Sequence, residues 1–178
     1  SSTEKNGLAY FEVNGTAQIY VCNGRYNNSK ISVYDLNGSL ARNITIANVR
    51  YSPSDITLDD NGTIYISEQN AVTSLANDGT FQWRTGKNVS ISDNGNGGSG
   101  DGEFNSARGI TLSPDGNLYV ADFENNRIQV LDKNGNFIRK FGTEGTAPGK
   151  LFRPNDLDFL SDGTLIVADD NYLHYFHS

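Results

Sequence analysis

Short apolar runs recur along the chain and are separated by polar turns that contain glycine. Apolar triplets stand at residues 19–21, 64–66, 118–120 and 165–167, at spacings of 45, 54 and 47 residues. An Asn-Gly or Asp-Gly pair precedes each triplet, and three further pairs follow the first three triplets. Such pairs accept the positive φ of two-residue hairpin turns. The pattern therefore predicts an all-β chain built from antiparallel hairpins.

The repeating unit is expected to contain four strands. In the third copy these strands are predicted over 109–113, 117–121, 127–131 and 136–141. The last of them contains "FIRKF", whose alternation suits a sheet that packs face to face with its neighbours. Four-stranded units at this period are typical of β-propeller blades. The predicted blades cover approximately 7–44, 54–85, 108–142 and 155–178.

The fourth copy ends at "YLHYFHS", inside its third strand. The leader "SSTEKN" is short and polar, unlike the outer strands of the other copies, so the last blade is expected to lack its edge strand. An unpaired strand edge invites pairing with another chain. Two alternatives stay open: the chain is a portion of a larger propeller, or a neighbouring subunit pairs with the edge at Leu173–Phe176.

The segment "GSGDGEFNSARGITLSPDGNLYVADFENNRIQVLDKNGNFIRKFG" (98–142) resembles an NHL repeat. Asn126-Arg127-Ile128 occupies the place of the tripeptide that names this family. The fourth copy, which begins "GKLFRPNDLDF" at Gly149, resembles it too, and the resemblance extends over nearly the whole chain. It implies a propeller, typically of six blades, that serves as a binding platform. This chain departs from that blade number.

Composition restricts the range of functions. The net charge of −7 argues against nucleic acid as the partner, because phosphate binding requires a basic surface. No apolar stretch approaches the roughly 20 residues that span a bilayer.

The lone Cys22 cannot form an internal disulfide and aligns with small residues of the other copies, which indicates a packing role. Trp83 is expected to pack between blades. Because the chain contains no Met, we expect a processed or partial product, for example one that has lost a signal peptide.

The two faces of the predicted propeller differ in their connections. All the Asn-Gly and Asp-Gly turns fall on one face, which we call the turn face. The opposite face carries the loops 23–29, 45–53, 68–70, 86–107, 122–126, 143–154 and 169–171, and we call it the loop face. Irregular loops on a rigid scaffold are where binding usually resides. The predicted binding residues, several of them an Arg beside an aromatic residue, are Arg25, Tyr26, Arg50, Tyr51, Arg108, Phe123, Glu124, Phe152 and Arg153.

Arg-aromatic pairs are favoured anchors at interfaces. The alternative is that these aromatic side chains pack beneath their own loops.

The polar cluster between residues 122 and 127 has the character of a turn rather than a catalytic site. Asp122 aligns with Asn23, Glu68 and Asp169 of the other copies, and an Asn just before the third strand also recurs. An active site occurs once, whereas this arrangement is repeated. The acidic group can accept hydrogen bonds from turn N–H groups, and Asn tolerates left-handed φ. We expect Arg127 to pair with Asp122.

The sequence bears on two types of metal-dependent enzyme. "RPNDLDF" (153–159) resembles the calcium-binding segment of gluconolactonase-type propellers, and that resemblance implies Asn155, Asn6 and Asp55 as ligands. The cation of Arg108 at an equivalent position would compete for those ligands. His174 and His177 are too few for the three-ligand catalytic zinc site that a resemblance to amidating lyases would require. We therefore expect no cofactor, with Ca²⁺ as the alternative.

The loop 86–107 carries several Asp, Asn and Glu residues, but Phe104 stands where an EF-hand requires an acid, so this loop is interpreted as structural.

Acceptor sequences for N-linked glycans occur in the first half of the chain. They are centred on Asn14, Asn27, Asn37, Asn43, Asn61 and Asn88. Turn chemistry accounts for three of them, but turns are exposed and would accept glycans on a secreted protein. The sequence therefore favours a non-catalytic interaction or assembly module that is secreted or lies at the cell surface. Its expected partner is a protein or a second copy of the chain. The alternative is a calcium-dependent lactonase.

Overall fold

The computed structural model describes residues 7–25, 28–46, 51–87 and 97–177. Within them it contains three four-stranded antiparallel sheets, one three-stranded sheet and one short 3-10 helix. Each sheet is one blade and holds strands that are consecutive in sequence. The predicted all-β fold of propeller blades is therefore confirmed. In the described part of the chain, no helix is long and apolar enough to cross a membrane.

The blades have the following strands. Blade 1 contains β1 (Leu8–Val13), β2 (Thr16–Arg25), β3 (Asn28–Asp35) and β4 (Leu40–Thr45). Blade 2 contains β5 (Asp55–Leu58), β6 (Ile64–Glu68), β7 (Ala71–Leu75) and β8 (Phe81–Gly86). Blade 3 contains β9 (Ala107–Leu112), β10 (Leu118–Asp122), the 3-10 helix η1 (Phe123–Asn125), β11 (Arg127–Leu131) and β12 (Phe137–Phe141). Blade 4 contains β13 (Asp156–Phe159), β14 (Leu165–Ala168) and β15 (Leu173–Phe176).

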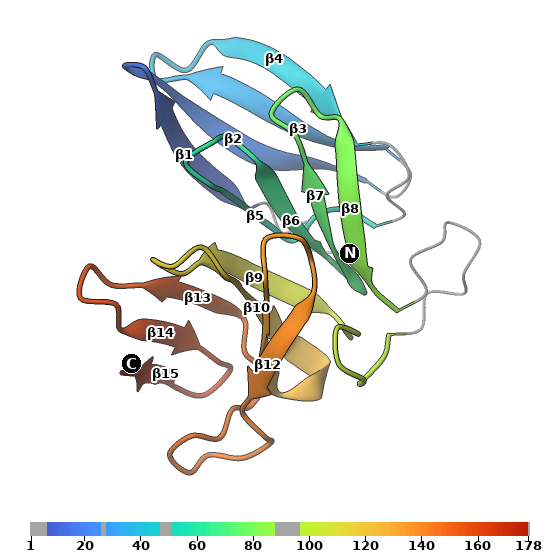
Figure 1. Ribbon diagram of the computed structural model, residues 1–178, viewed down its shortest axis with the longest axis vertical. Coiled ribbons are helices and arrows are strands. Elements are labelled where there is room, and N and C mark those ends of the chain that lie inside the picture. Colours follow the sequence, from blue (N-terminus) through green and yellow to red (C-terminus); the bar gives the residue numbers. More distant parts are fainter. Residues whose placement is uncertain (1–6, 26–27, 47–50, 88–96, 178) are drawn as a thin grey trace.

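The first strands of the four blades lie at the inside of the arrangement. Residues of β1, β5, β9 and β13 together line one cavity of about 320 Å³, which is the central channel. The following strands of each blade lie progressively further out, and the blades succeed one another in chain order (Figure 1). The start of every first strand consequently points to the loop-face mouth of the channel.

The core is divided into layers between neighbouring blades. Ile64 and Ile66 of β6 pack with residues of blade 1, whereas Tyr65 between them packs with residues of blade 3. Successive side chains of a strand point to opposite faces, so an uninterrupted apolar run serves two interfaces at once. Leu118 and Val120 of β10 likewise face blade 2, and Ala121 faces blade 4. This explains why the repeated triplets are apolar throughout.

Two single residues lie at these blade interfaces as predicted. The Cys22 side chain is 1% exposed and belongs to the core between blades 1 and 2. Trp83 of β8 contacts the ring of Tyr65, with centroids 6.0 Å apart, and its indole Nε1–H donates to the Lys133 carbonyl of blade 3 at 3.0 Å. Trp83 therefore links blade 2 to blade 3.

The hairpin turns correct one prediction. Only the Asn14-Gly15 turn places both central residues at positive φ, at 50° and 75°. In the other six turns, among them Asp115-Gly116, only the glycine has positive φ, and its N–H donates to a carbonyl three residues earlier. These six are longer turns that close with a glycine in the left-handed region, so the two-residue geometry predicted for them is wrong. The glycine is required in either case, because it adopts this φ at no steric cost.

The fourth blade has three strands in the described residues, as expected from the sequence. β14 lies between β13 and β15, and β15 is at the edge of the sheet. Tyr172, Leu173 and Tyr175 along this edge are 56%, 54% and 57% exposed. The leader 1–6, which the sequence does not predict to be an outer strand, lies outside the described residues.

Candidate functional site

Five of the predicted binding residues come together on the loop face. They are supplied by the start of β9, by η1 and by the loop before β13, and we call them the loop-face patch: Arg108, Phe123, Glu124, Phe152 and Arg153. Tyr26 and Arg50 lie outside the described residues, and for Arg25 only the backbone in β2 is described. Tyr51 does not belong to the patch; its carbonyl accepts a hydrogen bond from Ser29 Oγ in blade 1.

Phe123 is the centre of the patch. The guanidinium carbons of Arg108 and Arg153 both lie within 5.5 Å of the centre of the Phe123 ring. Arg153 also lies 5.7 Å from the centre of the Phe152 ring. Contacts between a guanidinium group and an aromatic face are attractive and favour arginine over lysine. Phe123 itself is buried, with 5% of its surface exposed, so the two cations cover it.

The charges of the patch are only loosely paired. Arg153 and Glu124 are 3.8 Å apart, and their side chains are 46% and 42% exposed. Arg108 donates to the neutral amide oxygen Asn155 Oδ1. Burial lowers the pKa of Arg108; the neighbouring Arg153 charge lowers it too, while Asp170 and Glu124 oppose the shift. The two guanidinium groups therefore repel each other across the shared ring.

The backbone of Arg153 is fixed in an uncommon conformation. Its φ is +55°, in the left-handed region that few residues with a side chain occupy. Its N–H donates to Asn126 Oδ1 at 2.9 Å, which ties the loop before blade 4 to the turn of blade 3. The preceding N–H, of Phe152, donates to Asp169 Oδ2 at 2.8 Å. Arg153 is thus held beside Phe123 by a carboxylate of its own blade and an amide of the blade before it.

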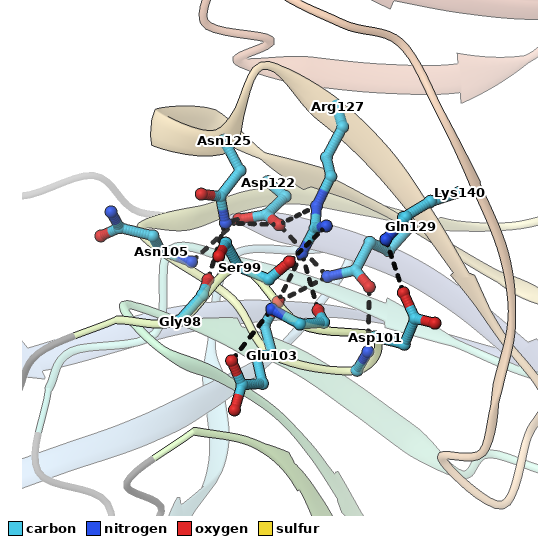
Figure 2. A network of polar contacts seen from close by, with 12 residues as sticks. Gly98, Ser99, Asp101, Glu103, Asn105, Asp122, Asn125, Arg127, Gln129 and Lys140 are labelled. Atoms are coloured by element: carbon cyan, nitrogen blue, oxygen red, sulfur yellow. Dashed lines mark hydrogen bonds and ion pairs between the residues drawn. The ribbon is translucent and has the colours of Figure 1, made fainter.

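A buried network around Asp122 ties the loop before β9 to η1 and β11 (Figure 2). Asp122 is fully buried and accepts hydrogen bonds from the Asn105 N–H, Asn125 Nδ2, Arg127 Nε and Gln129 Nε2. The pair between Arg127 Nε and Asp122 Oδ2, at 2.7 Å, is the one predicted from the sequence. Burial raises the pKa of Asp122 although these hydrogen bonds and the Arg127 charge act in the opposite direction.

The same network fastens the loop 98–105 to blade 3. Arg127 also donates to the carbonyls of Ser99, Gly100 and Glu103. Gln129 donates to Glu103 O and accepts from the Gly102 N–H, so its amide is used on both sides. The Asp122 cluster is thus structural, because its donors and acceptors are directed at one another and at the backbone.

The acidic position recurs with different partners. In blade 2, Glu68 pairs with Arg84 at 2.5 Å and accepts from Thr73. Burial raises the pKa of Glu68 to about 7, against the effects of Arg84 and Thr73. In blade 4, Asp169 pairs with His174 at 2.8 Å. Burial opposes ionisation of Asp169, but the hydrogen bonds of the Phe152, Tyr172 and Asn171 N–H groups and of His174 together lower its pKa. The acidic position is therefore repeated as a paired group in blades 2, 3 and 4. The left-handed φ expected of the Asn before the third strand occurs at Asn126 but not at Asn70 or Asn171, so that part of the prediction is wrong for blades 2 and 4.

The described candidate calcium ligands at the channel mouth already have hydrogen-bond partners. Asn155 Oδ1 accepts from the Arg108 guanidinium, so the oxygen that a calcium ion would require faces a cation. Asp55 Oδ2 accepts from the Ile110 N–H at 3.0 Å, and Asn6 lies outside the described residues. In the described ranges, no three His, Cys, Asp or Glu residues are grouped in a way that could hold a metal ion.

The other candidate metal ligands are engaged elsewhere. In the loop 86–107, Asp101 pairs with Lys140 at 2.6 Å and Glu103 Oε2 accepts from the Gly100 N–H, while residues 88–96 lie outside the described part. His174 is bound to Asp169, and His177 Nδ1 contacts Thr164 Oγ1 at 3.1 Å. His174 lies on the edge strand β15 and pairs with Asp169, the residue at the acidic position of its blade.

The glycan acceptor candidates lie away from the patch. Asn14, Asn37 and Asn61 are exposed in turns of the turn face, and Asn43 is exposed on the outer strand β4. Asn27 and Asn88 lie outside the described residues.

The structure also adds two interactions that the sequence did not predict. Glu68 and Arg84 form a buried pair, and Asn126 supports Arg153 across blades. The sequence signal for the Glu68–Arg84 pair was the charged Glu68 at the end of the strand that contains the apolar triplet 64–66. No local sequence signal relates Asn126 to Arg153, because they are 27 residues apart.

Comparison with known proteins identifies the repeat. The NHL repeat family matches residues 104–131. "NHL repeat-containing protein 3" from Homo sapiens is 32% identical over 127 residues, which are 67% of this chain and 33% of that protein. "Protein lin-41" from Caenorhabditis elegans is 54% identical over 43 residues, which are 24% of this chain and 4% of that protein. The "Peptidyl-glycine alpha-amidating monooxygenase B" of Xenopus laevis is 30% identical over 167 residues, 87% of this chain and 18% of its own length.

Solved structures share the fold at low sequence identity. The WD40 β-propeller domain of Doa1 superimposes with a TM-score of 0.64 and 11% identity over 94% of this chain and 50% of its own. Virginiamycin B lyase from Staphylococcus aureus gives a TM-score of 0.62 and 14% identity over 98% of this chain and 60% of its own. A proposed gluconolactonase gives a TM-score of 0.65 and 15% identity over 95% of this chain and 59% of its own. The chain thus spans a third of the human relative and about half to three fifths of these structures.

Proposed function

Since this chain belongs to the NHL-repeat β-propeller proteins, we propose that it is a non-catalytic module that binds a protein partner through the loop-face patch. The observation that carries the proposal is the convergence of Arg108, Phe123 and Arg153 from three different segments of the chain. Arg and aromatic side chains are the residues most enriched in binding hot spots. A rigid scaffold that presents them on loops is a typical binding arrangement.

The polar groups outside the patch support a binding role rather than a catalytic one. Asp122, Glu68 and Asp169 are each paired with a cationic or hydrogen-bonding side chain of their own blade. At the channel mouth, Arg108 and Asn155 are bound to each other. A nucleophile or a general base would have to be directed at a space that a substrate can enter.

Site-specific photo-crosslinking tests this proposal. A benzoylphenylalanine at position 152 of the full chain, produced in cells of the organism that encodes the protein, is expected to give a discrete crosslinked product. The same amino acid at Leu36, an exposed residue of the turn face, serves as the matched control. Crosslinking at position 36 but not at 152 would place the interface on the opposite face and refute the proposal.

We also propose that the protein is extracellular and carries N-linked glycans. The described acceptors Asn14, Asn37 and Asn61 are exposed on the turn face, so glycans there would leave the loop-face patch open. The check is an intact mass of protein expressed through a secretory pathway, before and after enzymatic removal of N-glycans. If the masses before and after this treatment both equalled that of the bare polypeptide, the glycans would be ruled out.

Self-association through the edge of β15 is the remaining part of the proposal. The exposed Leu173 and Tyr175 side chains, on a strand edge that pairs with no other strand of the described residues, are suited to pairing with a strand of a second copy. Light scattering across a hundredfold concentration range is expected to show a mass increase that Tyr175→Lys reduces. A monomer at every concentration would contradict it.

A further inference from the structure

Two arginines of the loop-face patch lack the close carboxylate partners that Arg84 of blade 2 and Arg127 of blade 3 possess. Arg84 and Arg127 are bound to buried carboxylates at 2.5 and 2.7 Å. Arg153 instead lies 3.8 Å from Glu124, beyond hydrogen-bonding distance. Arg108 bonds to a neutral amide, and among the described residues it forms no ion pair. The exposed Arg153–Glu124 pair contributes little to stability, so it yields readily to a better-placed anion.

The positions of these two arginines are determined before any partner arrives. Arg153 is held by its left-handed backbone, by Asn126 and by the rings of Phe123 and Phe152. Backbone outliers of this type concentrate at ligand-binding positions. When a guanidinium group stacks on a ring, its N–H groups still point outward in the guanidinium plane. They can therefore donate to a planar carboxylate. Less side-chain entropy is lost on binding when the group is already fixed.

We propose that the partner presents an acidic side chain of a peptide segment, which Arg153 and Arg108 bind together beside Phe123. This inference rests on the proposed function and specifies the chemistry of the partner. One carboxylate near both guanidinium groups relieves their mutual repulsion, and it adds charge-assisted hydrogen bonds where the present partners are loose or neutral.

The flanking charges favour a single carboxylate over a nucleic acid. Glu124 lies beside Arg153, and Asp170 Oδ1 accepts from Asn155 Nδ2 next to Arg108. A series of phosphates crossing the patch would meet both acids, and the whole chain carries a net charge of −7. A single carboxylate binds at one point, the two arginines, and does not have to pass both acids.

Glu124 has a definite part in this arrangement. Its carboxylate is the weakly held internal competitor for Arg153, and it repels an incoming acid. Removing its charge should therefore tighten binding, whereas removing either arginine should weaken it. A partner that used a basic side chain would show the opposite signs.

The experiment titrates the full chain with four defined probes and follows the arginine Nε–Hε resonances by NMR. The probes are pentaglutamate with blocked ends, blocked pentaglutamine, blocked pentalysine and a ten-nucleotide oligouridylate. Pentaglutamate is expected to shift the Arg153 and Arg108 signals, and pentaglutamine is not. Arg153→Gln should weaken pentaglutamate binding by about tenfold or more, the size expected for a charge-assisted hydrogen bond. Glu124→Gln should tighten it by about three- to tenfold.

The control is Arg139→Gln, since Arg139 also stacks on aromatic rings, those of Tyr119 and Phe141, but lies on the outer strand β12. It should leave the affinity unchanged. Preferred binding of oligouridylate or pentalysine, no shift with pentaglutamate, or weaker binding by Glu124→Gln would each overturn the inference. The proposed function is tested separately by crosslinking at position 152. If that crosslink survives Arg153→Gln, the loop-face interface stands and only the acidic partner is rejected.

Discussion

At the scale of single residues, the buried acids at the ends of the second strands hold the loop face together. Asp122 accepts from donors on three segments, namely the loop before blade 3, η1 and β11. A carboxylate has enough acceptor sites for such a node, and it forms charge-assisted hydrogen bonds at each of them. The side chain therefore substitutes for backbone pairing where the chain leaves the sheet.

Substitution of Asp122 tests this node. Asp122→Ala leaves the buried Arg127 guanidinium without its carboxylate, so we expect a loss of about 3–5 kcal/mol in the free energy of unfolding. Asp101→Ala breaks the pair with Lys140, whose two side chains are 56% and 44% exposed, and should cost only about 0–1 kcal/mol. Urea denaturation of both variants measures the difference. Similar losses for the two would show that the Asp122 network is not a structural node.

Asp55 predicts how stability depends on pH. Burial raises its pKa from 3.8 to about 6, with hydrogen bonds from Ile110 and Ile56 opposing and the Asp156 and Asp158 charges reinforcing the shift. The folded state thus favours the protonated acid. The stability that this group contributes is present below about pH 4 and is lost as the pH rises through about 6.

Asp55→Asn should remove this dependence. Relative to the unsubstituted protein, the variant should gain about 2–3 kcal/mol in the free energy of unfolding between pH 4 and pH 7.5. Asp60→Asn, at an exposed turn residue, controls for the loss of one negative charge. Chemical denaturation at the two pH values is the measurement. A stability difference that stays constant with pH would contradict the raised pKa.

At the scale of elements, the connection from η1 to β11 links blade 3 to the loop before blade 4. Asn126 caps the 3-10 helix with φ +53° and ψ +41°, and its side chain accepts from the Arg153 N–H. One residue therefore turns the chain into β11 and positions the patch arginine. Asn tolerates the left-handed region better than residues with larger side chains.

Two substitutions separate these roles of Asn126. Asn126→Gly keeps the left-handed backbone and loses the hydrogen bond, so it should cost about 1 kcal/mol. Asn126→Ala loses both and should cost roughly 1–2 kcal/mol more. Thermal unfolding compares the two variants, and the binding experiment with pentaglutamate shows whether Arg153 has been displaced. Equal costs would mean that the backbone conformation is not strained.

At the scale of the whole molecule, the blades approach one another most closely around the channel. A Cβ atom added to Gly109 of β9 would lie 2.7 Å from the Asp156 Cα and 2.6 Å from its Oδ1, on β13. At Gly7 the corresponding contact is with the Asp55 Cα, at 2.4 Å. These glycines set the spacing of the inner strands because they carry no side chain.

Gly109→Ala is expected to push blades 3 and 4 apart. The contact involves backbone, which cannot rotate away, so the loss in the free energy of unfolding should be about 1–3 kcal/mol. Gly163→Ala provides the comparison, because its Cβ would meet nothing within 4 Å but its φ is +84°. Amide hydrogen exchange should show faster exchange in both β9 and β13 for Gly109→Ala, and only in the β13–β14 turn for Gly163→Ala. Unchanged exchange in β13 for Gly109→Ala would contradict the close approach.

Much of this molecule follows from local rules in the sequence. The period of the apolar triplets, the glycine turns and the alternation of "FIRKF" predict the blades, because strand pairing within a hairpin depends on neighbouring residues. The same comparison of copies assigns Asp122 and Asn126 to a repeated turn and pairs Arg127 with Asp122. The exact turn type was not predictable, since Asn-Gly and Asp-Gly pairs suit turns of several lengths.

The tertiary structure alone decided which loops meet. Arg108, Phe123 and Arg153 belong to separate segments, and no local preference relates them. They converge because β9 and β13 pack side by side at the channel, which brings the start of one blade's first strand beside the loops of the next. Likewise, only the packing of blades put the cation of Arg108 against Asn155. Sequence period determines the blade, and the stacking of blades determines the site.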